Sequence, residues 1–260
     1  MANPVLNRDK FEQDIEYAET MSFAGGEVMT VNGTLQTTAF MGLIMVMAAV
    51  FTWTRFTLGY TDTAQFLTIG GAIGGFILAL IISFMRISPK FASIRYLVPF
   101  YAALEGLFLG GISAMFEAEY PGIVSNAIAG TFAAMFSMLL LYRAHVIRCT
   151  DKFRSVIIIS TLSIAAIYLV DIIGHFFGYS IPVIYSSSPL GILFSVVFVI
   201  IAALNLIIDF DFIEQGAMRN FPKEYEWYGA FGLLVTIVWL YIEILRLLSK
   251  VQGDNQCYFT

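Results

Sequence analysis

Six ionisable side chains lie within, or at the edge of, long apolar stretches of the sequence: Glu105, Asp171, His175, Asp209, Asp211 and Glu243. A charged group in the middle of a membrane span costs on the order of 3 kcal/mol, so such residues are candidates for a functional site by default. Carboxylates in this setting could hold protons or hard cations, which prefer oxygen ligands. The spacing of these residues indicates which of them could act together.

Two of the acids, Asp209 and Asp211, stand in the stretch from Asn205 to Gly216. Residues two apart are separated by about 200° around a helix, so these two carboxylates cannot share one face. We expect Asp211 at the membrane edge, either solvated or capping the following turn. Asp209 is then the site candidate of this stretch.

Local pairing could explain some of the remaining candidates. Asp171 and His175 are four residues apart and can meet on a helix, either in a structural hydrogen bond or as part of a pathway. Glu243 could pair with Arg246, three residues further on. Glu105 has no charged neighbour closer than about three helical turns, so local pairing does not explain it.

Catalytic and metal-binding motifs are not found. The sequence has no H-E-x-x-H, no G-x-S-x-G and no recognisable Ser/His/Asp set, so an enzyme is not expected. Neither cysteine has metal-ligand spacing, and we expect no cofactor and no metal beyond transient cation contacts at the carboxylates. A net charge of −5 without a basic cluster argues against nucleic-acid binding.

The composition is that of an integral membrane protein, with 58% hydrophobic and 13% charged residues. Helices are expected because backbone amides in lipid must be satisfied within the segment. The fold class is therefore all-α, with one membrane domain over residues 37–249 and no soluble domain. Seven segments are long enough to span the bilayer: 37–56, 65–85, 97–116, 122–141, 156–177, 190–212 and 228–248.

The distribution of basic residues predicts the orientation. With the amino terminus in the cytoplasm, eleven of the fourteen Lys and Arg residues lie on the cytoplasmic side. Residues 1–36 then form a polar, acidic cytoplasmic segment that is not a cleavable signal peptide, and residues 250–260 form a short outer tail. From the rise per residue, Glu105 and Asp209 lie roughly 12 and 5 Å from the cytoplasmic end, and Asp171 and Glu243 about 22 Å from it.

Four stretches of the chain resemble the Bax inhibitor family of membrane proteins (transmembrane Bax-inhibitor-motif proteins) in its bacterial-type branch. They occur in the order found in that family and extend over most of the chain: Met29 to Thr34, Tyr101 to Ser113, Asn205 to Gly216 and Glu226 to Gly229. The resemblance implies a seven-helix bundle with the last helix central, located in the cytoplasmic (inner) membrane.

The same resemblance implies a calcium leak gated by protonation of two aspartates, one on the sixth helix and one on the seventh. Asp209 matches the first. The second should fall near Leu234 or Val235, which are apolar here, so Asp209 needs another partner, with Glu105 the first choice and Asp211 the second. Two carboxylates that are close together in a low-dielectric site cannot both ionise cheaply, so their shared proton becomes a switch.

The leading hypothesis is a proton-sensitive cation leak channel or transporter, with calcium as the expected ion. Glu105 and Asp209 would form an inner constriction and Asp171 an outer layer. Asp211 belongs to the same pathway and gate, and Glu243 and His175 are secondary candidates. The alternative is a membrane regulator that does not transport and that binds a membrane quality-control protease or another stress-response partner through residues 1–36. The sequence does not specify an oligomeric state.

Overall fold

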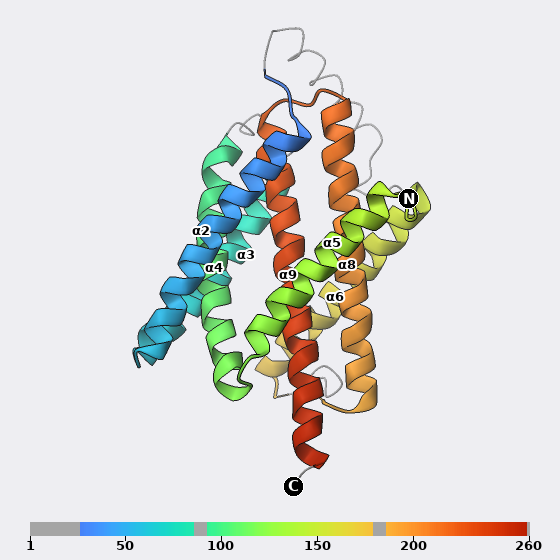
Figure 1. The fold of residues 1–260 in the computed structure, drawn as a ribbon. Coiled ribbons are helices and arrows are strands. Elements are labelled where there is room, and N and C mark those ends of the chain that lie inside the picture. The colour runs from blue at the N-terminus through green and yellow to red at the C-terminus, as the bar shows by residue number, and fades with distance from the viewer. Residues whose placement is uncertain (1–26, 86–92, 179–185, 259–260) are drawn as a thin grey trace. The chain divides into compact units, whose positions relative to one another are not determined.

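A computed structural model describes residues 27–85, 93–178 and 186–258 of the 260-residue chain. The described part of the chain folds into seven α-helices (Figure 1): α2 (Val31–Thr57), α3 (Thr61–Met85), α4 (Ile94–Glu119), α5 (Ile123–Arg143), α6 (Asp151–Phe176), α8 (Pro189–Met218) and α9 (Glu224–Tyr258). Each is long and apolar enough to cross a membrane. The predicted all-α membrane fold is confirmed.

The helices extend beyond the apolar segments recognised in the sequence. Helix α2 begins at Val31, because Thr30 caps it by accepting a hydrogen bond from the Gly33 amide. Helix α8 continues to Met218, and α9 runs to Tyr258 through most of the predicted outer tail. Polar residues can remain helical outside the hydrocarbon layer, so hydropathy alone underestimates helix length. Residues 1–26 of the predicted acidic segment lie outside the described residues.

The chain divides into two compact units. The first unit comprises Met1–Gly111 and Asp211–Leu234, and the second comprises Ile112–Phe210 and Val235–Thr260. Helices α4, α8 and α9 contribute residues to both units.

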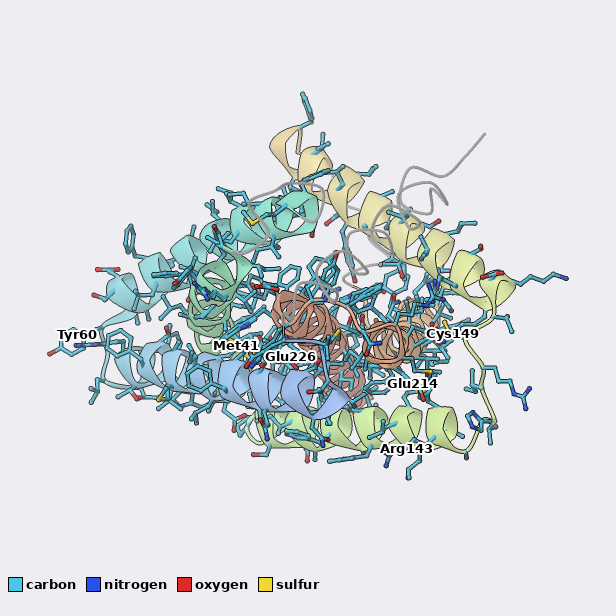
Figure 2. All side chains as sticks on the ribbon, turned by 90° about the horizontal axis from the view of Figure 1, so that it is seen from above. Met41, Tyr60, Arg143, Cys149, Glu214 and Glu226 are labelled. Atoms are coloured by element: carbon cyan, nitrogen blue, oxygen red, sulfur yellow. The ribbon has the colours of Figure 1, made fainter. Side chains whose placement is uncertain are left out.

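Helices α2 and α3 of the first unit are joined by a three-residue turn. Gly59 adopts a positive φ of 84°, the left-handed conformation in which glycine commonly terminates a helix. Figure 2 shows Tyr60 at this end of the two helices, pointing away from them, and its side chain is exposed. Met41, in the middle of α2, is by contrast fully buried.

Glycines allow close helix packing in the first unit. A Cβ atom at Gly71 of α3 would lie 2.5 Å from the backbone oxygen of Leu104 on α4. At Gly106 and Gly110 of α4, a Cβ would overlap the backbone of α2. Gly70 has no atom within 4 Å of such a Cβ, so not every glycine of α3 lies at a packing contact.

A carboxylate organises the turn between α4 and α5 in the second unit. Both oxygens of Glu117 accept backbone hydrogen bonds, from the amide of Gly122 at 2.6 Å and from that of Val124 at 3.0 Å. These contacts satisfy amides at the start of α5, which have no partners within the helix.

The helices differ in burial. In the most apolar stretch of α4 and of α9, half of the residues are buried. The corresponding share is 11–17% in α2, α3, α5 and α6. The less buried helices expose many large apolar side chains, such as Phe76, Phe132 and Leu169. Exposed apolar surface of this extent is typical of helices in contact with lipid.

Candidate functional site

Asp209 lies on the part of α8 that belongs to the second unit. Its Oδ2 atom is buried and has no hydrogen-bond partner among the described residues. The carboxylate forms a side-chain hydrogen bond with Thr236 on α9. Thr236 follows Leu234 and Val235 directly in sequence. A hydroxyl group therefore contacts Asp209 from the stretch of α9 in which the resemblance places an acid.

One expectation about this end of α8 is corrected. Helix α8 continues for about two and a half turns beyond Asp209, whereas the sequence predicted a span ending at Phe212; the predicted depth of Asp209 in the membrane stays a prediction. Asp211 is also internal to the helix and only 8% exposed. It is therefore neither solvated nor a helix cap, because the helix does not end at Phe212.

Glu243 is the centre of a buried polar cluster in the second unit. Its side chain is 1% exposed, and its Oε1 accepts hydrogen bonds from the Tyr168 hydroxyl at 2.7 Å and the Trp239 indole at 3.0 Å. Arg246 forms an ion pair with Oε2 at 3.3 Å and also donates to the Tyr168 hydroxyl. The predicted Glu243–Arg246 pair is confirmed, and α6 supplies a further partner.

Asp171 and His175 of α6 are also close to each other. His175 Nδ1 lies 3.8 Å from the Asp171 carboxylate and 3.2 Å from the Asp171 backbone oxygen. Asp171 is 3% exposed, whereas the His175 side chain is 56% exposed. The pair thus connects a buried carboxylate to the surface of the second unit.

A buried lysine lies near the end of the apolar part of α9. Lys250 is 5% exposed, and its ammonium group donates to the Ser195 hydroxyl at 2.8 Å and to the Gly191 backbone oxygen at 3.1 Å. A serine–lysine pair can serve as nucleophile and base in some hydrolases. Ser195 is only 2% exposed, which keeps substrate-sized molecules away from its hydroxyl.

Glu105 belongs to the first unit, on α4. No hydrogen bond or ion pair joins its carboxylate to another residue in the described ranges. A Cβ at Gly75 of α3 would lie 2.6 Å from Glu105 Oε2, so the glycine makes room for the acid. Asp209 is assigned to the second unit. The predicted pairing of the two acids therefore stays a prediction.

Sequence reasoning missed most of the contacts that these buried groups make with other helices. Tyr168 and Glu243 are 75 positions apart, and Lys250 and Ser195 are 55 apart. No local spacing indicates contacts between helices so distant in sequence. Within the described residues, no three His, Cys, Asp or Glu side chains gather into a metal site.

The start of α2 and the start of α9 are held together in the first unit. Val28 and Pro222 form an antiparallel bridge, and the Met29 amide donates to the Phe221 carbonyl at 2.7 Å. Glu226 is 5% exposed, and its Oε1 accepts from both the amide and the hydroxyl of Thr30, at 2.9 and 3.0 Å. This carboxylate therefore fixes the beginning of α2 against the first turn of α9.

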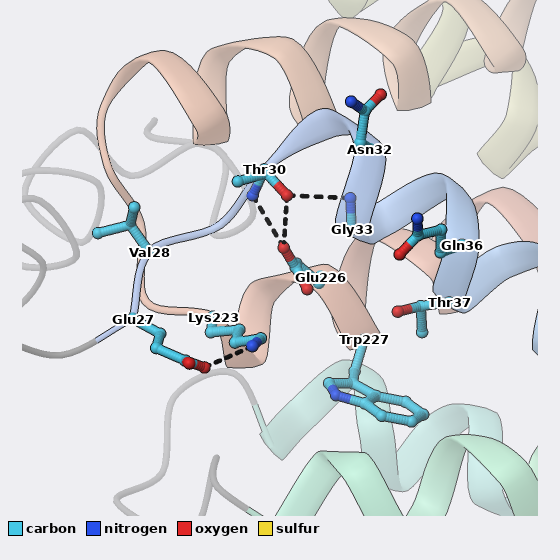
Figure 3. A pocket seen from close by; sticks show the side chains of 10 residues that line it. All are labelled: Glu27, Val28, Thr30, Asn32, Gly33, Gln36, Thr37, Lys223, Glu226 and Trp227. Carbon is cyan, nitrogen blue, oxygen red and sulfur yellow. Dashed lines mark hydrogen bonds and ion pairs between the residues drawn. The ribbon is translucent and has the colours of Figure 1, made fainter.

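A pocket of about 630 Å³ adjoins this contact (Figure 3). Lys223 forms an ion pair with Glu27 at its edge, and the hydrogen bond to that carboxylate raises the pKa of Lys223 above its ordinary value of 10.5. The other lining residues come from the segment just before α2, the start of α2 and the start of α9: Val28, Thr30, Asn32, Gly33, Gln36, Thr37, Glu226 and Trp227.

The comparisons with known proteins agree with this architecture. A family model described as Bax inhibitor 1 like matches residues 3–253, which is nearly the whole chain. No curated protein and no solved structure gives a match. Seven apolar helices and a family match over nearly the full length lead to one conclusion: the chain belongs to the Bax inhibitor 1 like family and is an integral membrane protein.

Proposed function

We propose that the protein is a proton-sensitive leak channel or transporter for cations, with calcium as the ion, and that Asp209 is the residue at which protons and cations compete. The observation that carries the proposal is the buried Oδ2 atom of Asp209, which has no hydrogen-bond partner among the described residues. An ionised carboxylate in such a place is costly unless a proton or a cation joins it. Thr236 forms a hydrogen bond with the Asp209 carboxylate but does not neutralise its charge.

Calcium suits this chemistry because it is a hard ion that binds carboxylate, hydroxyl and carbonyl oxygens. Glu105 offers a second carboxylate without an ion pair among the described residues. Asp171 and Glu243 differ from it, because His175 and Arg246 already lie beside them. We therefore assign the main part of the pathway to Asp209 and Glu105, and supporting parts to Asp171, Asp211, Glu243 and His175. No catalytic activity and no resident cofactor form part of the proposal.

The test is calcium flux in liposomes that contain the purified protein and an enclosed fluorescent indicator, measured from pH 6 to pH 8. The wild type should conduct calcium with a rate that depends on pH. Asp209→Asn should remove most of that dependence, and Glu105→Gln should lower the rate. Asp151→Asn, at the exposed start of α6, is the matched control and should leave both unchanged. Flux no higher than in empty liposomes, or flux indifferent to both site variants, would reject the proposal.

Residues 1–36 support a second candidate, a regulator of a membrane protease, because they carry six acids against two basic residues. Removing residues 1–26 separates the two functions, since it leaves the bridge between Val28 and Pro222 intact. If the protein is a regulator, the truncated protein should no longer capture its partner. If the protein is a leak, the truncated protein should still conduct calcium. In both cases we propose the cytoplasmic membrane as the location, with the amino terminus inside and the carboxyl terminus outside.

A further inference from the structure

The pocket at the start of α2 and α9 contains a carboxylate of which only one oxygen accepts hydrogen bonds from the described residues. Glu226 Oε1 accepts both hydrogen bonds from Thr30, whereas Oε2 accepts none from the described residues. The residue is 5% exposed, yet it lines the pocket. A Cβ at Gly33 would overlap this carboxylate, so glycine at position 33 is needed for the acid to lie where it does. Glu226 is thus held rigidly with one oxygen available.

Among the described residues, one negative group of the pocket has no ion-pair partner. The ammonium group of Lys223 forms its ion pair with Glu27 and has only a weaker electrostatic interaction with Glu226, so the Glu226 carboxylate is not paired with a described basic group. Figure 3 shows Glu226 in the middle of the pocket, with Lys223 and Glu27 on one side and Gln36, Thr37 and Trp227 on the other. This second side offers an amide, a hydroxyl and an indole ring, and none of these groups carries charge. The pocket therefore favours a cationic ligand.

The kind of cation follows from the number of ligands. Calcium takes six to eight oxygen atoms and favours several carboxylates, but the described residues contain no group of three acidic, His or Cys side chains that could hold a metal. An ammonium group needs fewer acceptors, because it has three hydrogen-bond donors. It is also attracted to the face of an indole ring. The volume of about 630 Å³ accommodates an organic molecule.

We propose that this pocket binds the ammonium group of an organic amine, with Glu226 Oε2 as the charged acceptor and Trp227 as the aromatic wall. Two sources share this chemistry. Both α2 and α9 begin at the pocket, so it lies at the end of two membrane spans, where the headgroups of aminolipids are found. A soluble polyamine is the other source. The site is independent of the proposed cation pathway at Asp209.

The test uses the full-length protein in nanodiscs of phosphatidylglycerol and phosphatidylcholine, titrated with spermidine while the thermal unfolding midpoint is followed. The wild type should be stabilised with saturation. Glu226→Gln keeps an oxygen for Thr30 but removes the charge, so the apparent affinity should fall by about tenfold or more. Glu224→Gln, in the same first turn but outside the pocket lining, is the control and should bind like the wild type.

A second variant tests the aromatic wall without affecting the contacts of Thr30. Trp227→Leu should weaken spermidine binding several-fold, and it decides the matter if Glu226→Gln does not fold. Adding phosphatidylethanolamine to the nanodiscs should weaken spermidine binding if the lipid is the natural ligand and leave it unchanged if a soluble amine is. Three results would overturn the proposal: no saturable stabilisation, equal losses in the Glu224 and Glu226 variants, or equal stabilisation by calcium chloride at matched ionic strength.

Discussion

Replacing Glu243 should reveal how much the buried cluster of α9 contributes to stability. In Glu243→Leu, the Trp239 indole loses its acceptor, and Arg246, with 28% of its side chain exposed, loses its carboxylate partner. An unsatisfied buried donor costs about 1–3 kcal/mol, and breaking a buried ion pair about 3–5 kcal/mol. Because Arg246 still reaches solvent and the Tyr168 hydroxyl, we expect a total loss of about 3–5 kcal/mol.

Glu243→Gln is the informative comparison, because its amide oxygen can still accept from Tyr168 and Trp239. The charge and one of the two acceptor oxygens of Arg246 are lost, and we expect a cost of about 1–2 kcal/mol. At roughly 2–4 °C per kcal/mol for a chain of this size, the midpoints should fall by about 10 °C for Leu and about 4 °C for Gln. Reversible unfolding in detergent micelles, followed by near-ultraviolet circular dichroism, measures both. Equal losses in the two variants would refute the assignment of Glu243 as a shared acceptor.

Three further predictions concern packing, a buried charge and pH. Gly106→Ala should lower the unfolding midpoint strongly, because the added Cβ would overlap the backbone of α2. Gly42→Ala should be neutral or slightly stabilising, because no atom lies within 4 Å of a Cβ at that position. Thermal melts of the two variants compare them directly. Lys250→Met should leave the midpoint unchanged or raise it, since the hydrogen-bond acceptors of the buried ammonium group among the described residues are neutral, while Ser195→Ala should lower it by removing one acceptor; the opposite order in the same melts would contradict this. The raised pKa of Lys223 means that its ion pair contributes fully below the ordinary lysine value of 10.5 and is lost as pH rises through the higher folded value. The midpoint difference between Lys223→Met and the wild type should therefore be constant from pH 6 to pH 8 and small, because the pair is exposed, and a difference that changes within this range would disprove the pairing.

The sequence by itself determined the class of the protein and its seven membrane helices. Both follow from properties that are local along the chain: the length of an apolar run, and the need of every backbone amide in lipid for a partner within its own helix. The pairs of Glu243 with Arg246 and of Asp171 with His175 are local in the same way, because residues three and four apart meet on any helix. Asp209 became a candidate site residue in the same way, from its place in an apolar run, and that assignment stays a prediction.

The tertiary structure decided where the helices end and what lies beside each acid. Asp211 is buried because α8 continues past it, and Lys250 is buried because α8 supplies its acceptors. Thr236 contacts Asp209, and Thr30 contacts Glu226, through pairings of helices that are distant in sequence. Such contacts depend on which helix faces pack together. A single sequence shows the apolar length of each helix but not which residue of a neighbouring helix lies beside each polar group.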